Sequence, residues 1–165
     1  MSDELTPSQA AKVVWNECGE ENPDIDKIRR CLGIQGNKAP PYRDEDDYTA
    51  VYYAALRDHV DILNLLLTHS NYKEIFDLPN TINGKTPIIS AAYWGYLECV
   101  KVLYHHGADL THRNDRGRTA LGCARFHNNT VVVGFLAAAS VYDECRKEEN
   151  PDIDKIRTCL EVHKD

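Results

Sequence analysis

The sequence has little that could anchor it in or carry it across a membrane. No apolar run approaches the roughly 18 residues that a spanning helix needs, and the first residues, MSDELTPSQ, lack the basic and apolar segments of a secretory signal. We therefore expect an intracellular protein that acts in the cytoplasm, or in the nucleus, without a membrane partner. Its six cysteines are then expected to be free thiols, because disulfides are rare in reducing compartments.

Motifs of the common catalytic sites are also missing. The chain contains no glycine-rich phosphate loop, no GxSxG, no HExxH and no CxxC. The densest group of metal-ligand residues is Cys99, His105, His106 and His112, and its spacing matches no common zinc pattern. We expect a protein that is not an enzyme and that needs no metal or cofactor.

Charge is unevenly distributed along the chain. The net charge is −7, and an acidic cluster occupies residues 44–47. A nucleic-acid partner is not expected, because such proteins normally present a basic patch to the phosphates. One small basic cluster is present, formed by Arg113, Arg116 and Arg118. It is either a set of solvated loop charges or a contact point for an acidic protein partner.

The most informative stretch is residues 84–109, GKTPIISAAYWGYLECVKVLYHHGAD. Thr86 and Pro87 are typical of a helix start, with Thr free to cap and Pro in the first helical position. Gly95 suits the left-handed residue after a helix end, and Gly107 suits the end of a second helix. This stretch therefore predicts two short antiparallel helices.

The same pattern occurs three times. Thr119 lies 33 residues after Thr86, and Thr49 lies 37 residues before it, with the four surplus residues expected in the loop 71–80. The corner between the two helices falls on Asp58, Gly95 and Asn128, which are residue types that tolerate positive φ.

These copies, TAVYYA, TPIISA and TALGCA, resemble the T-P-L-H-x-A motif of the ankyrin repeat, and residues 107–109 match the family's GAD ending. The resemblance implies an all-α solenoid of about five stacked antiparallel helix pairs, with short loops and no substantial sheet. The motif histidine is replaced by Tyr52, Ile89 and Gly122.

We expect residues 1–165 to form a single domain with a cap at each end. The expected units are an N-terminal cap pair at 1–41, repeats at 42–80, 81–112 and 113–139, and a C-terminal helical cap at 140–165. In the first cap we expect a helix over residues 6–20 that starts at Ser8 without the TPLH opening. A second helix should begin with Asn22 as its N-cap and Pro23 at its first position.

The two ends of the chain share a copied segment. EENPDIDKIR at residues 20–29 recurs without change at 148–157. The copy is either a helix pair that closes the stack at both ends or the beginning of a second module that joins others head to tail. Before it, no loop signal interrupts residues 130–147, so we expect one long helix there, with Asn150 capping a last helix.

The resemblance implies a protein-binding module that holds its partner on the concave face of the first helices and on the loop tips. Tyr93 and Trp94 carry most weight, since two adjacent aromatic side chains cannot both point into a thin layer, although Trp94 packed over a helix corner is the alternative. The candidate binding residues are Tyr53, Leu56, Arg57, Ile82, Lys85, Tyr93, Trp94, Arg113, Asn114, Arg116, Arg118, Phe126 and His127. Ser90 and Cys123 are also expected on the exposed face.

Two functions are compatible with this pattern. The first is an adaptor, inhibitor or scaffold that acts as a monomer on one protein partner. The second is a structural subunit of a large assembly, which could associate with itself through the copied ends.

Overall fold

The computed structural model describes residues 5–36 and 40–146, and the regular secondary structure in these residues is helical, with one isolated β-bridge between Arg43 and Thr49. The elements in chain order are α1 (Pro7–Gly19), α2 (Ile25–Gln35), α3 (Ala50–Leu56), α4 (Val60–Thr68), the 3₁₀ turn η1 (Ser70–Tyr72), α5 (Pro87–Trp94), α6 (Leu97–His105), α7 (Ala120–Phe126) and α8 (Thr130–Arg146). The predicted all-α solenoid of helix pairs is confirmed.

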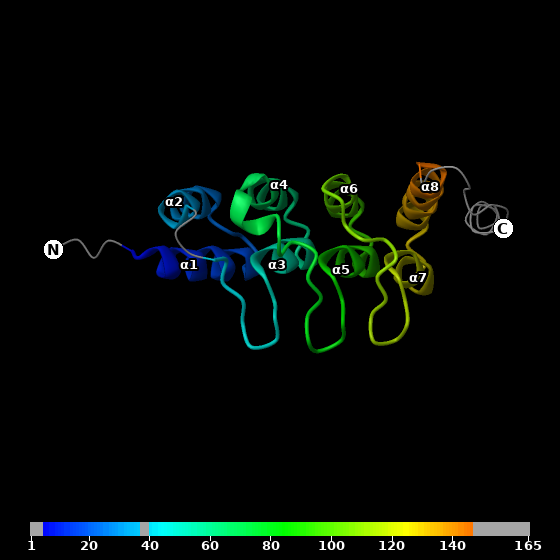
Figure 1. The fold of residues 1–165 in the computed structure, drawn as a ribbon, viewed down its shortest axis with the longest axis horizontal. Coiled ribbons are helices and arrows are strands. Elements are labelled where there is room, and N and C mark those ends of the chain that lie inside the picture. The colour runs from blue at the N-terminus through cyan, green and yellow to red at the C-terminus, as the bar shows by residue number, and fades with distance from the viewer. Residues whose placement is uncertain (1–4, 37–39, 147–165) are drawn as a thin grey trace.

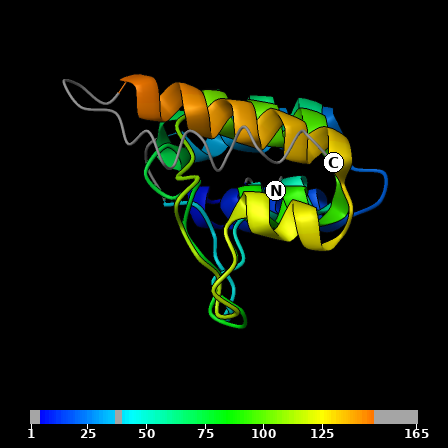
Figure 2. The same ribbon diagram turned by 90° about the vertical axis from the view of Figure 1, so that its right-hand side faces the viewer.

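The helices form two layers. α1, α3, α5 and α7 make one layer, here called the inner helices, and α2, α4, α6 and α8 make the other (Figure 1). Three long loops leave the inner layer on the same side and overlie one another when the stack is seen end-on (Figure 2). The inner helices and these loops therefore enclose a concave face.

Threonine caps explain where most inner helices begin. Thr49 and Thr119 accept hydrogen bonds from the backbone N–H of Tyr52 (3.0 Å) and Gly122 (3.2 Å). Thr86 occupies the same N-cap position, but its side chain makes no capping bond, and its hydroxyl is buried without a partner. The predicted position of Thr86 is therefore right and the predicted capping bond is wrong.

The first helix also begins with a threonine N-cap. Thr6 is the N-cap of α1, Pro7 is its first residue, and Thr6 and Gln9 bond each other's backbone N–H in a capping box. The expectation that Ser8 caps this helix is therefore wrong, and the helix does begin with the Thr-Pro half of the repeat opening. The Thr-Pro pair at residues 6 and 7 was the signal, and the lack of Leu and His after it concealed it.

The second helix begins two residues later than predicted. Asp24, and not Asn22, is the N-cap of α2, and it accepts the N–H of Lys27 at 2.8 Å. The reason is tertiary: the carboxylate of Glu17 on α1 accepts the N–H of Asp24 (3.1 Å) and pairs with the Lys27 ammonium. This contact holds the chain extended before α2, so Pro23 lies outside the helix.

All three predicted corners have positive φ. The values are 59° at Asp58, 84° at Gly95 and 58° at Asn128. Each corner turns the chain from an inner helix to its outer partner. These positive φ values support the assignment of Asp58, Gly95 and Asn128 to equivalent positions in the three repeats.

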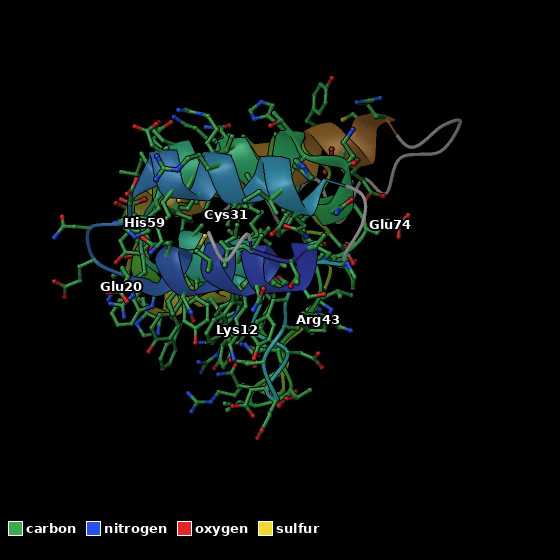
Figure 3. All side chains as sticks on the ribbon, turned by 90° about the vertical axis from the view of Figure 1, so that its left-hand side faces the viewer. Lys12, Glu20, Cys31, Arg43, His59 and Glu74 are labelled. Atoms are coloured by element: carbon green, nitrogen blue, oxygen red, sulfur yellow. The ribbon has the colours of Figure 1, made fainter. Side chains whose placement is uncertain are left out.

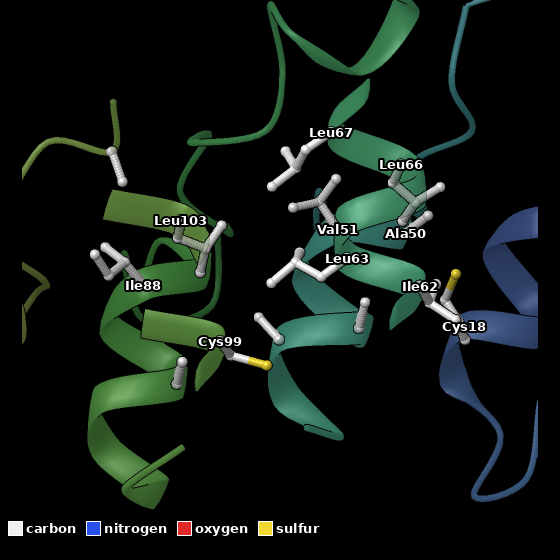
Figure 4. Close-up of a cluster of buried hydrophobic side chains, with 14 of the residues drawn as sticks. Cys18, Ala50, Val51, Ile62, Leu63, Leu66, Leu67, Ile88, Cys99 and Leu103 are labelled. Carbon is white, nitrogen blue, oxygen red and sulfur yellow. The ribbon is translucent and has the colours of Figure 1, made fainter. Parts of the chain in front are cut away.

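The core is built mainly from alanines of the inner helices and leucines of the outer helices. Leu63, Leu66 and Leu67 of α4 pack between layers, near Val51 of the inner helix α3 (Figure 4). The inner helices contribute small side chains, which allow close helix contact, and the fully buried ones are Ala10, Ala54, Ala55, Ala91, Ala92 and Ala124. Burying each leucine stabilises the fold by roughly 1.5–3 kcal/mol.

The four surplus residues of the first repeat lie in two places. Three of them fall between the end of α4 and Asn80, where η1 has no counterpart after α6, and one falls between Asn80 and Thr86. The prediction that loop 71–80 holds the surplus is thus mostly right. Tyr72 of η1 is buried beside Gln35, so the extra turn packs against the end of α2.

The last described helix runs as predicted. α8 extends from Thr130 to Arg146 without a break, about 25 Å at 1.5 Å per residue. The remaining expectations for this end, Asn150 as a cap and the copied segment 148–157, lie outside the described residues. The expected fifth helix pair also lies there.

Candidate protein-binding face

The concave face carries a continuous row of aromatic rings. Trp94 and Phe126 are 55% and 58% exposed, so they form solvent-facing ends of the row. Tyr93 lies between them, with ring centroids 5.1 Å from Trp94 and 3.8 Å from His127. His127 in turn lies 5.1 Å from Phe126. We call these four residues the aromatic strip; it joins the ends of α5 and α7.

A cation lies over the ring at the same place in two successive repeats. The ammonium of Lys85 is 3.8 Å from the centroid of Tyr93, and the guanidinium carbon of Arg118 is 3.6 Å from the centroid of Phe126. Arg118 follows Lys85 by 33 residues, as Phe126 follows Tyr93. Burial lowers the pKa of Lys85, and the nearby charge of Arg116 lowers it further.

The corresponding positions of the first repeat differ in chemistry. Leu56 and Arg57 stand where the next repeat has Tyr93 and Trp94, and Leu56 is half-buried while Arg57 is exposed. Tyr53 is half-buried, with its ring 5.2 Å from that of Trp15 on α1. The concave face therefore changes from an aliphatic and cationic edge at α3 to an aromatic one at α5 and α7.

A second aromatic group at the N-terminal end was missed from the sequence. Trp15 packs edge-on against Tyr42 at 5.2 Å, its indole N–H donates to the carbonyl of Tyr48 (2.7 Å), and Lys12 lies 5.4 Å from the Tyr42 ring. Lys12 appears with Arg43 on the inner-helix side of the molecule (Figure 3). No spacing signal marked Tyr42, because it belongs to the irregular connection before the first repeat.

The loop tips are held by one acidic or amide side chain each. The side-chain oxygen of Asp44 accepts the N–H groups of Asp46 and Tyr48, and the oxygen of Asn114 accepts those of Arg116 and Arg118, both at 3.0 Å. Asn80 holds the middle loop in the same way. Neighbouring loops are also bonded to one another, as in the N–H of Asp115 to the carbonyl of Asn83 (3.1 Å).

Three predicted positions are not on the surface. Asn114 is only 7% exposed, since its side chain points back into the loop that it holds. Ser90 and Cys123 are buried because they face the preceding repeat, with Ser90 close to the Tyr52 phenol. Tyr52, which replaces the motif histidine, is itself buried next to Ser90 and Asn80. Burial raises the pKa of the Tyr52 phenol and of the Cys123 thiol.

The other predicted loop residues are accessible. Ile82 is 56% exposed, and Arg113 and Arg116 are exposed at the tip of the third loop. Arg113 donates to the carbonyl of Gly117 at 2.7 Å, which leaves most of its guanidinium free for solvent.

The residues considered for a metal each have a separate partner. His105 and His106 bond backbone carbonyls of their own helix, His112 bonds the carbonyl of Gly84, and the Cys99 thiol faces Asp58. Across residues 5–36 and 40–146, no group of three or more His, Cys, Asp or Glu side chains could hold a metal ion. Among the same residues, no helix is both long and apolar enough to cross a bilayer.

Paired helices stacked in register, with loops bonded from layer to layer, define a helical repeat solenoid. A model of ankyrin repeats matches in three copies, over residues 20–114 and 78–146. The chain belongs to the ankyrin repeat family, whose repeats are protein interaction modules.

The curated relatives are much longer proteins of diverse function. The chain is 31% identical over 130 residues to an Arabidopsis thaliana protein named as an E3 ubiquitin-protein ligase, XBAT31, covering 75% of this chain and 26% of the relative. It is 32% identical over 130 residues to glycerophosphocholine phosphodiesterase GDE1 of Candida albicans, covering 75% and 11%. It is 31% identical over 96 residues to mouse ankyrin repeat and SAM domain-containing protein 6, covering 56% and 10%. The chain thus spans about a quarter or less of each relative.

Proposed function

We propose that this chain is a non-enzymatic adaptor, inhibitor or scaffold that binds a protein partner on its concave face. The observation that carries the proposal is the exposure of Trp94 and Phe126 in adjacent repeats, joined by Tyr93 and His127 into one aromatic surface. Tryptophan, tyrosine and arginine dominate the energetics of protein interfaces. The proposed contact residues are Tyr53, Leu56, Arg57, Ile82, Lys85, Tyr93, Trp94, Arg113, Arg116, Arg118, Phe126 and His127, with Asn114 as the residue that holds the third loop.

Preorganisation supports this proposal. The strip rests on α7, whose N-cap is hydrogen bonded, and on α5, whose last turn is bonded by the Asn129 amide, and bonds between loops hold the tips in position. A surface that is already ordered loses little conformational entropy when a partner binds. Five cysteines of the described residues are free, which suits action in the cytoplasm or nucleus.

Affinity purification with a strip variant tests the proposal. Tagged wild type, the double variant Trp94→Ala/Phe126→Ala and the control Tyr142→Ala would be used to capture partners from the source cell. Tyr142 is a matched control, because it is 57% exposed and has a cation near its ring, yet lies on α8 outside the strip. We expect the strip variant alone to lose a partner. Equal recovery with all three proteins would refute the assigned face, and recovery of no specific partner would refute the function.

A structural subunit is the second candidate, supported by the identity of residues 20–29 and 148–157. Such a subunit would associate with itself through these copied ends. Sedimentation over a concentration series distinguishes this candidate from a monomeric adaptor. A mass that stays at 18.7 kDa throughout would exclude self-association.

A further inference from the structure

The cation and ring pairs of the strip form two equivalent binding units. Lys85 over Tyr93 and Arg118 over Phe126 occupy the same repeat positions. Each cation lies in the loop just before the N-cap, and the rings belong to the inner helices α5 and α7, which pack against each other. None of the salt bridges among the described residues involves Lys85, Arg116 or Arg118. The cationic side of the strip is therefore not neutralised by carboxylates of this chain's described part.

Stacking leaves the cations able to bind an anion. A guanidinium that lies on a ring uses its face, and its N–H groups remain available around the edge; an ammonium keeps three donors. The ring also restricts the long side chain, so that less entropy is lost when an anion binds. Arg116, whose charge acts on Lys85, adds a third cation to this side of the strip.

The spacing of the two units selects the conformation of the ligand. Neighbouring packed helices lie roughly 8–10 Å apart. A polyproline II segment completes a turn in three residues, about 9 Å, so side chains at positions i and i+3 face the same way at the required distance. In a β-strand the same two side chains face opposite ways. Aromatic-lined grooves are also the surfaces that bind polyproline II segments.

We infer that the strip binds an acidic protein segment in the polyproline II conformation, with two carboxylates three residues apart over Lys85 and Arg118 and prolines between them against the rings. The inference rests on the proposed function and specifies its partner. Complementarity with the cations accounts for the acidic residues, and the repeat spacing accounts for their separation.

Dye-labelled synthetic peptides test this inference by fluorescence anisotropy. The probe contains a Glu-Pro-Pro-Glu core. A spacing control contains Glu-Glu-Pro-Pro, a charge control contains Gln-Pro-Pro-Gln, and a helical probe carries two glutamates seven residues apart in an alanine-rich sequence. We expect the first peptide to bind about ten-fold more tightly than each control and to weaken as salt rises from about 0.05 M to about 0.5 M. Equal binding of any control, or no binding at a concentration on the order of 1 mM, would overturn the inference.

Charge-removing variants locate the binding. Lys85→Met and Arg118→Met should each weaken the probe about ten-fold. The matched controls Lys73→Met and Arg30→Met remove exposed cations outside the strip and should change binding less than about two-fold. Equal losses in the control variants would show a general charge effect and refute the site.

The same variants separate the inference from the proposed function. If a cellular partner depends on Trp94 but binds Lys85→Met and Arg118→Met as well as wild type, the function stands and the acidic partner is wrong. If the wild type forms a dimer that both variants abolish, the occupant of the strip is a second copy, and the inference is equally wrong.

Discussion

The side-chain amide of Asn129 donates to the carbonyl oxygen of Tyr93, and also to that of Ala92, each at 2.9 Å. These two carbonyls lie in the last turn of α5, where no N–H group of the same helix is available as a donor. Asn129 belongs to the next repeat, so this one side chain links two successive repeats. At the junction between the N-terminal helix pair and the first repeat, His59 plays a similar role, with its Nε2 atom 2.8 Å from the carbonyl of Glu20 (Figure 3).

Removing the amide should loosen this junction. We expect Asn129→Ala to lower the free energy of unfolding by about 1–2 kcal/mol, because two carbonyls at the end of α5 lose their donor. Urea denaturation followed by circular dichroism measures the change. Asn64→Ala is the matched control, since Asn64 bonds only a carbonyl one turn earlier on its own exposed helix face. A loss of similar size in the control would contradict the assigned role.

Gly95 should not tolerate a side chain. Its φ is 84°, and a Cβ atom there would lie 2.9 Å from Oδ1 of Asn129. We expect Gly95→Ala to destabilise the fold by about 1–3 kcal/mol, from backbone strain and displacement of Asn129. Gly33→Ala should act in the opposite direction by about 0.5–1 kcal/mol, because Gly33 lies within α2 with open space around it. Thermal denaturation of both variants checks the signs, and a stable Gly95→Ala protein would disprove the close approach.

Equivalent threonines should respond differently to the same substitution. Thr49→Val and Thr119→Val each remove a capping bond and should cost about 1 kcal/mol. Thr86→Val should be neutral or stabilising, because it replaces a buried hydroxyl that has no partner with a methyl group of similar size. Denaturant midpoints of the three variants provide the measurement. A cost at Thr86 equal to the other two would show that its hydroxyl does contribute a cap.

The carboxyl group of Asp77 should make the free energy of unfolding depend on pH, and the direction of this dependence follows from its raised pKa. Burial raises its pKa to about 6, with a smaller increase from Asp109, while the hydrogen bond from the Asp109 N–H (2.7 Å) and the proximity of His112 act the other way. Because the folded protein binds this proton more tightly than the unfolded chain, its contribution to stability falls as pH rises from about 4 to about 6.

Asp77→Asn removes this titration. At pH 7 the variant should be more stable than wild type by about 1 kcal/mol, allowing for the partial exposure of the group, and the difference should vanish below about pH 4. Urea denaturation between these pH values measures it, with Asp61→Asn, an exposed carboxylate of α4, as the control. A variant less stable than wild type at pH 7 would contradict the raised pKa.

Much of the fold followed from local patterns. Proline at the first position of α5 and the positive φ of Asp58, Gly95 and Asn128 are properties of a few adjacent residues, and the sequence shows them directly. The exposed Trp94 followed from its neighbour Tyr93, because adjacent helix positions cannot both face the same thin layer. The late start of α2 did not follow, since it depends on Glu17 reaching across from another helix.

The order of helices and corners was determined by the sequence alone, because short-range periodicity and backbone preference act within one repeat. The burial of three other predicted surface residues was decided only by the tertiary structure. Asn114 is buried by the loop that it holds, and Ser90 and Cys123 by the preceding layer. The placement of Lys85 and Arg118 over their rings likewise depends on how a loop folds along a helix. The three side chains are buried by the fold of a loop or by the neighbouring layer, and short-range sequence patterns do not describe either contact.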